Sequence, residues 1–226
     1  MKSPRDMLDR DGYLIVGKIF SSRRMEEVAV HLDNLSLTGA GTRNLLRFSW
    51  CQELAQELRE HPHPAMLLPA DSVAIQAILF EKSVQRNWLV PFHQDIHIPV
   101  GQRVDHPQLS GWSEKEGAWH VRPPVAFLEQ LLGVRVHADD CSMDHGPLRV
   151  VPGSHQRGRL SDEDISMFRQ RNGERSCLAN KGDIVVMRPL LLHASSKAAQ
   201  PNGRRVIHFL FGPKKLPFGL TYPSTV

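Results

Sequence analysis

Three side chains with the chemistry of metal ligands stand at spacings that allow them to meet. His93 and Asp95 are two residues apart, and His193 follows much later in the chain. On a β-strand, residues i and i+2 point to the same face, so both can reach one ion. Two imidazoles and one carboxylate form the facial triad that binds non-haem iron(II) and leaves coordination positions open. We therefore take His93, Asp95 and His193 as the candidate iron(II) ligands and catalytic residues.

Each of these residues also has a plainer structural interpretation. With 12 histidines in the chain, a His-X-Asp pair arises readily by chance, and His193 follows the apolar run 189–192 as a core histidine would. The run 89–92 before His93, however, favours burial of the pair. A buried imidazole and carboxylate need partners, and a metal supplies one. The surrounding motifs decide between the two interpretations.

Two neighbouring arginines near the end of the chain are candidates for an anion anchor. Arg204 and Arg205 precede an apolar segment, 206–211, that is predicted to be a strand. Only one of two neighbours on a strand can face inward. A planar guanidinium binds a carboxylate through two hydrogen bonds, whereas a lysine cannot do so. We favour Arg204 and keep Arg205 as the alternative, and a solvated basic corner of the surface is the structural interpretation of both.

The pattern of apolar segments predicts a mainly β protein with flanking helices. Short apolar runs separated by Gly- and Pro-containing turns are predicted to be strands, at residues 13–16, 73–80, 89–98, 134–139, 148–151, 184–187 and 206–211. Helical spacing or helix-start signals occur at residues 22–35, 51–60, 124–132 and from 161 onward. Many short strands of this kind are typical of a double-stranded β-helix, a jelly roll of the cupin type.

Four motifs occur in an order that resembles the phytanoyl-CoA dioxygenase family. They are Phe92-His-Gln-Asp95, the segment HGPLRVVPGSH from His145 to His155, Lys181-Gly-Asp183, and His193-Ala-Ser-Ser followed by Asn202-Gly-Arg-Arg205. The resemblance spans about residues 12–212, and the combined set is specific where the single pieces are not. It implies a double-stranded β-helix that uses iron(II), 2-oxoglutarate and O2. The resemblance is to the family, which acts on many substrates, and not to the fatty-acyl-CoA enzyme that named it.

Positions that match the family pattern supply candidates for binding the co-substrate. The resemblance implies that Arg204, eleven residues after His193, holds the distal carboxylate of 2-oxoglutarate, and that Ser195 adds a hydroxyl. It also makes Gln94 a candidate contact to the co-substrate or the substrate. Three further polar residues beside apolar runs are pocket candidates by family position, with surface roles as the equal alternative: Lys82, Asn87 and Arg135.

On this interpretation the protein is an iron(II)/2-oxoglutarate-dependent dioxygenase that hydroxylates a substrate and releases succinate and CO2. Related halogenases have a small residue where this chain has Asp95, so hydroxylation is favoured over halogenation. Desaturation, ring closure and epimerisation use the same ligands and stay open. Two other classes also stay open: a cupin-like metalloenzyme that does not use 2-oxoglutarate, which the arginine pair disfavours, and a non-catalytic binding protein on the same scaffold, which the intact triad disfavours.

Length and composition fit one soluble domain, with no nucleic-acid or membrane partner expected. The 226 residues are 41% hydrophobic, contain no apolar run long enough to span a membrane, and begin without the apolar stretch of a secretory signal. Three cysteines without CxxC spacing indicate a reducing compartment, so we expect a cytoplasmic protein. The net charge of +4 comes from scattered basic residues, so no nucleic-acid partner is expected. Nothing in the sequence indicates an oligomeric state.

A polar insertion bears on the class of substrate. We expect residues 1–226 to form a single oxygenase domain in which residues 100–133 form a lid over the barrel mouth. This insertion contains Trp112, Trp119 and three prolines, but no long basic segment for the phosphates of coenzyme A. An aromatic, proline-stiffened cover fits a small metabolite better than a fatty acyl-CoA. A macromolecular substrate would need an open groove, of which the sequence shows no sign.

Overall fold

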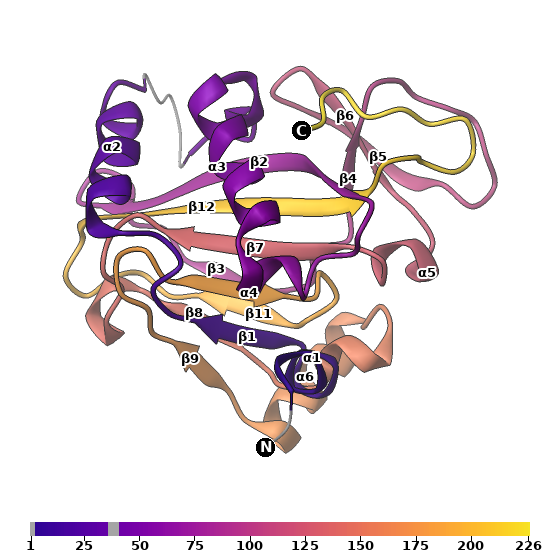
Figure 1. The fold of residues 1–226 in the computed structure, drawn as a ribbon. Coiled ribbons are helices and arrows are strands. Elements are labelled where there is room, and N and C mark those ends of the chain that lie inside the picture. Colours follow the sequence, from indigo (N-terminus) through magenta and orange to yellow (C-terminus); the bar gives the residue numbers. More distant parts are fainter. Residues whose placement is uncertain (1–2, 36–40) are drawn as a thin grey trace.

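Two antiparallel sheets face each other in the computed structural model, which describes residues 3–35 and 41–226 (Figure 1). The larger sheet has five strands in the order β1, β10, β7, β12, β2. Their bounds are Tyr13–Val16 (β1), Ile184–Met187 (β10), Leu132–His137 (β7), Asn202–Pro213 (β12) and Ser72–Ser83 (β2). β2 and β12, each 12 residues long, pair along their length and form the longest wall of the fold.

The smaller sheet has four strands in the order β3, β11, β8, β9. They span Val90–His93 (β3), His193–Ser195 (β11), Leu148–Val150 (β8) and Arg175–Cys177 (β9). Apolar side chains from both sheets, among them Val150, Val185 and Met187, pack together in the interior. The two facing sheets confirm the predicted double-stranded β-helix, a jelly roll with flanking helices.

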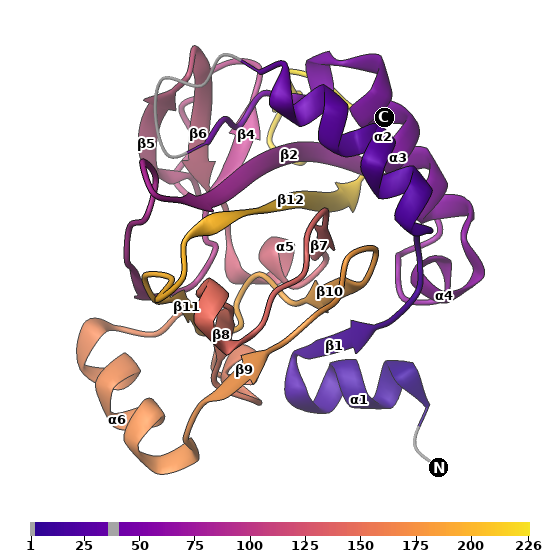
Figure 2. The same ribbon diagram turned by 90° about the vertical axis from the view of Figure 1, so that its left-hand side faces the viewer.

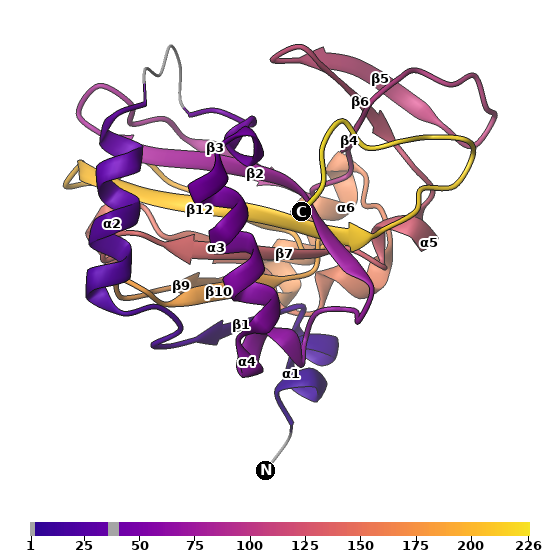
Figure 3. The ribbon, with the colours of Figure 1, turned by 45° about the horizontal axis from the view of Figure 1, so that its top comes forward.

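Helices α2 (Ser22–Asp33) and α3 (Ser49–Glu60) cover the outer face of the larger sheet (Figure 3). The helices are α1 (Pro4–Asp11), α2 (Ser22–Asp33), α3 (Ser49–Glu60), α4 (Pro62–Ala65), α5 (Val125–Leu128) and α6 (Asp162–Asn172), with 3₁₀ turns at Leu45–Arg47, Met143–His145 and Ser154–Arg157. α2 buries Met25, Val28 and Leu32, the face that its 3.6-residue periodicity predicts. These side chains join the outward-facing residues of β7 and β12 in the main apolar core. Within the described residues, no helix is long and apolar enough to cross a membrane.

A third sheet, which the sequence did not predict, forms from residues 98–122, mostly inside the insertion 100–133. β4 (Ile98–Val100), β5 (Ser110–Lys115) and β6 (Ala118–Arg122) pair in the order β4, β6, β5 beside the larger sheet (Figure 2). The β5–β6 hairpin turns at Glu116 and Gly117, both with positive φ, as a two-residue hairpin turn requires. Glu-Gly is not one of the usual sequence signals for such a turn. The helix expected at 124–132 is only the single turn α5, because Leu132 already belongs to β7.

The strand expected at 89–98 is interrupted at the candidate metal site. β3 ends at His93, β4 begins at Ile98, and residues 94–97 are irregular. The Asp95 amide donates to the Pro189 carbonyl (2.9 Å), a contact with the loop that precedes β11. The argument that one continuous strand aligns His93 with Asp95 was therefore wrong. A loop held by distant backbone groups places Asp95 instead.

Candidate metal centre and co-substrate pocket

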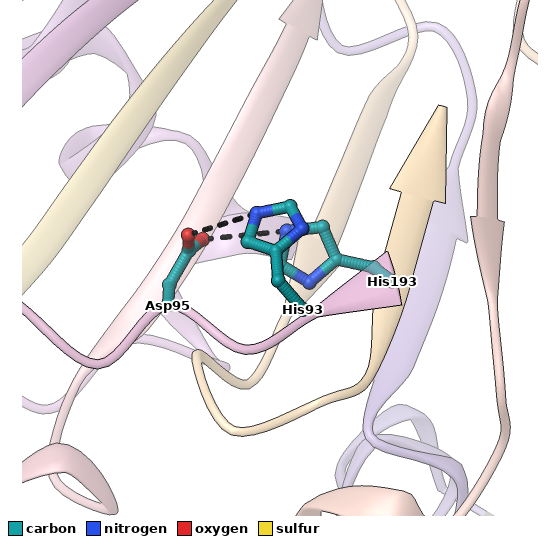
Figure 4. Close-up of side chains that lie close together, drawn as sticks. All are labelled: His93, Asp95 and His193. Atoms are coloured by element: carbon teal, nitrogen blue, oxygen red, sulfur yellow. Dashed lines mark ion pairs between the residues drawn. The ribbon is translucent and has the colours of Figure 1, made fainter. Parts of the chain in front are cut away.

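His93, Asp95 and His193 come together at the edge of the smaller sheet (Figure 4). His93 at the end of β3 lies directly opposite His193 at the start of β11, with ring centroids 4.2 Å apart. Asp95 Oδ1 lies 3.7 Å from His93 Nε2, and Asp95 Oδ2 lies 3.6 Å from His193 Nε2. The three ligand atoms all lie within 4.8 Å of one another. One divalent ion can bridge such a group after small side-chain adjustments, since its bonds to N and O are about 2 Å long.

Both imidazoles are fixed in the tautomer that a metal requires. His93 Nδ1 is 2.9 Å from the Pro91 carbonyl, and His193 Nδ1 is 2.8 Å from the Leu191 carbonyl. A carbonyl oxygen only accepts, so each Nδ1 carries the proton and each Nε2 has its lone pair free. Burial lowers the pKa of His193 to about 4, which keeps its ring neutral. A ligand imidazole whose other nitrogen donates to a carbonyl is the usual arrangement at protein metal sites.

A third imidazole, which the sequence analysis did not place at this site, lies beside Asp95. His208 Nε2 is 3.8 Å from Asp95 Oδ2, and the side chain is buried. Burial lowers its pKa to about 3, so this ring is neutral as well. The signal that would have found it is strand parity, because Arg204 and His208 are four residues apart on β12 and share its inner face.

A cavity of about 450 Å³ runs past the triad along the inner faces of β2 and β12. The pairing of β12 with β2 fixes the order of the residues along the cavity wall. Arg204 lies opposite Lys82 at one end, and His208 lies opposite Ile78 at the level of Asp95. Gln76 continues the wall toward the other end. At about 3.3 Å per residue, Arg204 and His208 are about 13 Å apart along the strand. The triad therefore lies partway along the cavity, with space on both sides.

The end of the cavity around Arg204 is lined by cations and by the Ser195 hydroxyl. Arg204 Nη2 and Ser195 Oγ both donate to the Gly146 carbonyl, at 2.7 Å and 3.0 Å, so the two donors converge on one point. Burial, with the charges of Arg204 and Lys197, lowers the pKa of Lys82 to about 8. Burial and the same Arg204 charge lower the pKa of Arg135 to about 10. Among the described residues that line the cavity, Asp95 is the one carboxylate, so these cations face each other without a matching anion.

Comparison of the sequence with known families gives a match over most of its length. A family model described as phytanoyl-CoA dioxygenase matches residues 8–206. This chain belongs to the phytanoyl-CoA dioxygenase family. No curated protein matches the sequence.

Several solved structures share the fold of this chain. HygX from Streptomyces hygroscopicus, solved with nickel and 2-oxoglutarate bound, is 16% identical, with a TM-score of 0.66 over 98% of this chain and 90% of that chain. The α-ketoglutarate-dependent epimerase SnoN from nogalamycin biosynthesis is 14% identical, with a TM-score of 0.68 over 92% and 81%. EctD from S. alaskensis, solved with 2-oxoglutarate and 5-hydroxyectoine, is 18% identical, with a TM-score of 0.65 over 94% and 76%. At these identities the likeness shows a shared fold.

The family and the ligand set agree on the cofactors. Two neutral imidazoles and one carboxylate on one side of an ion, with the other positions left open, fit iron(II). The family is described as one of dioxygenases, and HygX, which shares the fold, was solved with iron in one structure and with 2-oxoglutarate in another. The cofactor and co-substrates expected from the sequence, iron(II), 2-oxoglutarate and O2, are thereby confirmed.

Two of the residues taken as pocket candidates do not line the cavity of this family member. Arg205 lies on the opposite face of β12, where its guanidinium donates to Asp139 (2.8 Å) and Asp33 (2.5 Å). Asn87 forms two hydrogen bonds with the backbone of Ala198, at 2.9 Å and 2.7 Å. The alternative anchor Arg205 therefore faces away from the triad, and Asn87 holds a loop.

Gln94 borders the cavity, but its amide is already used by the protein. The amide nitrogen donates to the Gly158 and Leu190 carbonyls (2.8 Å and 2.6 Å), and the oxygen accepts from the Leu160 amide (2.8 Å). These bonds join residues 94–97 to the loops before α6 and β11. Gln94 thus holds the irregular segment that carries Asp95, and its contact with the co-substrate or substrate stays a prediction.

The aromatic residues are distributed differently from the sequence expectation. Trp112 and Trp119 pack edge to face, with centroids 6.3 Å apart, in an apolar cluster around the third sheet, and neither lines the cavity. Trp88, Leu89 and Phe80 supply apolar wall instead. The argument from an aromatic cover of two tryptophans was therefore wrong, because their rings are used to pack the third sheet.

Lys82 should make 2-oxoglutarate binding depend on pH. Its charged form attracts the anion, and its pKa in the free site is about 8. As the pH rises from 7 to 9 the free protein loses this charge, so the dissociation constant should rise by up to about tenfold per unit above the pKa. Anaerobic calorimetric titration of the iron(II)-loaded protein with 2-oxoglutarate measures this dissociation constant at each pH. Lys82→Met should bind 2-oxoglutarate more weakly at pH 7, and its dissociation constant should depend less on pH. An unchanged pH dependence in this variant would show that a group other than Lys82 causes it.

Proposed function

We propose that this protein is an iron(II)/2-oxoglutarate-dependent dioxygenase that hydroxylates a small-molecule metabolite and releases succinate and CO2. One observation carries the proposal: the His93–Asp95–His193 group and the Arg204–Ser195 pair open onto the same cavity. A metal site by itself would fit a cupin-like enzyme without 2-oxoglutarate. A metal site that shares its cavity with a buried, converging anion anchor fits a chelating dicarboxylate.

Two groups of residues have separate roles in the proposed reaction. His93, Asp95 and His193 hold iron(II) on one side, while Arg204 and Ser195 hold the distal carboxylate of 2-oxoglutarate. Iron(II) with 2-oxoglutarate and O2 supplies the oxidising chemistry, and the protein positions the substrate and excludes water. Arg204 Nη2 and Ser195 Oγ already donate to the Gly146 carbonyl, so the Ser195 hydroxyl must turn from that carbonyl to donate to 2-oxoglutarate, whereas the buried charge of Arg204 attracts the carboxylate directly.

Hydroxylation is the outcome we propose, because Asp95 is present as the third ligand. A carboxylate ligand occupies the coordination position that a halide would need, so halogenation is disfavoured. Epimerisation by SnoN on the same fold means that the product, rather than the fold, identifies the reaction. Incorporation of one oxygen atom from O2 into the product identifies hydroxylation.

A compact substrate fits the size of the cavity. Its volume of about 450 Å³ lies at the lower end for ligand pockets, and 2-oxoglutarate takes part of it. Little room remains for a fatty acyl-CoA. We keep the single-domain arrangement and the lid role of residues 100–133 as proposals. The three buried, unpaired cysteines support the proposed cytoplasmic location.

Succinate release from 2-oxoglutarate tests the proposed function. The assay contains iron(II), ascorbate, O2 and a panel of candidate small metabolites, with long-chain acyl-CoA as the contrasting substrate. We expect succinate formation that depends on iron and is stimulated by a small metabolite. Stimulation by the acyl-CoA alone would overturn the substrate class, and the absence of 2-oxoglutarate binding would overturn the reaction class.

A further inference from the structure

A second basic group lines the cavity away from Arg204, and neither the triad nor the proposed co-substrate anchor uses it. Lys115 at the end of β5 and Arg43, in the segment before α3, both line the cavity wall. Asp95 is near enough for its charge to raise the pKa of Lys115, against the lowering by burial and by Arg43. The Lys115 ammonium therefore faces the cavity that contains the triad.

Arg43 has a carboxylate counter-ion, whereas Lys115 has none among the described residues. Arg43 Nη1 lies 3.1 Å from Glu116 Oε1, and its backbone amide donates to Glu116 Oε2 at 2.9 Å. The Lys115 ammonium forms no hydrogen bond or ion pair with any described residue, although its backbone pairs with Ala118 in the sheet. Residues 1–2 and 36–40, which lie outside the description, contain no Asp or Glu that could balance it. A partly buried lysine without a counter-ion is costly unless a ligand supplies the charge.

Binding of iron(II) and 2-oxoglutarate does not neutralise the positive charge of Lys115. The two positive charges of the ion cancel the two negative charges of the dicarboxylate, so the excess of cations around the cavity persists in the loaded enzyme. The distal carboxylate of 2-oxoglutarate is expected at Arg204, four residues before His208 on β12. On the paired strand β2, Ile78 lies opposite His208, and Gln76 lies two residues, about 7 Å, further from Arg204. Lys115 is thus available to a different ligand.

Polar groups around Lys115 complete a binding surface. His120 Nδ1 donates to the Ala118 carbonyl (3.1 Å), so its Nε2 accepts from Gln76 Nε2 (3.1 Å). His97 also lines the cavity here, and burial together with the charges of Lys115 and Arg122 lowers its pKa. These neutral groups suit the uncharged polar part of a substrate. Among the described residues that line this side, the Lys115 ammonium is the one charged group without an ion-pair partner.

We infer that the substrate carries an anionic group, a carboxylate, sulfate or phosphate, which binds the Lys115 ammonium on the side of the triad away from Arg204. This inference rests on the proposed function and names its substrate class. It places the oxidised C–H bond between two anion sites, a few bonds from the anionic group. Amine-rich substrates are disfavoured, because they would meet Lys115 and Arg43 as like charges.

Anion binding to the loaded enzyme tests the inference without knowledge of the substrate. The protein is held anaerobically with iron(II) and saturating 2-oxoglutarate, which occupies the Arg204 end. Sodium sulfate and sodium acetate are added in separate titrations, with sodium chloride matched in ionic strength, and the melting temperature is recorded. Lys115→Gln is compared with wild type and with Lys214→Gln, a control at an exposed lysine.

We expect sulfate or acetate to raise the melting temperature of wild type and Lys214→Gln above the chloride baseline, and the rise to be lost in Lys115→Gln. Acetate alone would identify a carboxylate site, and sulfate alone would identify a sulfate- or phosphate-sized site. An equal rise in Lys115→Gln, or no rise in wild type, overturns the inference. The proposed function is judged separately, by whether 2-oxoglutarate with iron(II) stabilises the same proteins.

Turnover gives a second, independent measurement. Small carboxylates and phosphate esters are assayed for succinate release beside their neutral amides or alcohols and beside amine-rich compounds. We expect an anionic member to be preferred, with Lys115→Gln raising its KM at least tenfold while the KM for 2-oxoglutarate stays unchanged. Preference for a neutral or amine-rich compound, with the same KM in Lys115→Gln, contradicts the inference even though the dioxygenase activity itself would then be established.

Discussion

Replacing His193 with alanine should abolish tight iron(II) binding and, with it, succinate formation. His193 supplies one of three ligand atoms, and its Nε2 lies 3.6 Å from Asp95 Oδ2. Loss of a group that merely orients a metal ligand costs about 10–100-fold in affinity, so loss of the ligand itself should cost more than about 100-fold. Anaerobic calorimetric titration of the metal-free protein with iron(II) measures the effect, and one ion per chain is expected for wild type.

A matched control separates the metal site from histidine loss in general. His31 is exposed on α2 and stacks on Trp50, far from the ligand set. His31→Ala should retain wild-type stoichiometry and affinity. Circular dichroism and the melting temperature of the metal-free proteins show whether His193→Ala folds. A folded His193→Ala variant with unchanged stoichiometry and affinity would refute the ligand assignment.

Replacing Arg204 with alanine should raise the KM for 2-oxoglutarate far more than it alters iron(II) affinity. Arg204 is buried, and its guanidinium reaches the same point as the Ser195 hydroxyl. Truncating one partner of a buried, hydrogen-bonded charge pair costs about 2–5 kcal/mol, or roughly 30-fold to several thousandfold in affinity. Succinate formation at varied 2-oxoglutarate, and iron(II) titration of the same protein, measure the two effects.

The adjacent arginine provides the control for this experiment. Arg205 is on the same strand but faces outward, where it bonds to Asp139 and Asp33. Arg205→Ala should lower the melting temperature, because it removes the guanidinium hydrogen bonds to Asp139 and Asp33, yet leave the KM for 2-oxoglutarate unchanged. If Arg205→Ala raises this KM and Arg204→Ala does not, the anchor has been assigned to the wrong arginine.

The sequence by itself determined the elements whose signals are local. The apolar period of α2 predicts its buried face, and the β-branched run 184–187 coincides with β10. The residue types of His93, Asp95 and His193 predicted the metal chemistry, because two imidazoles and a carboxylate with open positions form the facial triad associated with non-haem iron(II). The order of the motifs was sufficient to predict the family. Each of these signals lies within a short stretch of chain or in the identity of a side chain.

Only the tertiary structure decided which residues meet, because contacts between distant segments leave no local pattern. The break at 94–97 depends on Pro189, Leu190 and Gly158, which hydrogen-bond to Asp95 or Gln94 from far along the chain. The choice between Arg204 and Arg205 depends on the pairing register of β12, since a shift by one residue reverses which side chain faces inward. His208 and Lys115 reach the cavity through strand pairing and a tight hairpin turn. Register and long-range hydrogen bonding, rather than residue type, assembled the site.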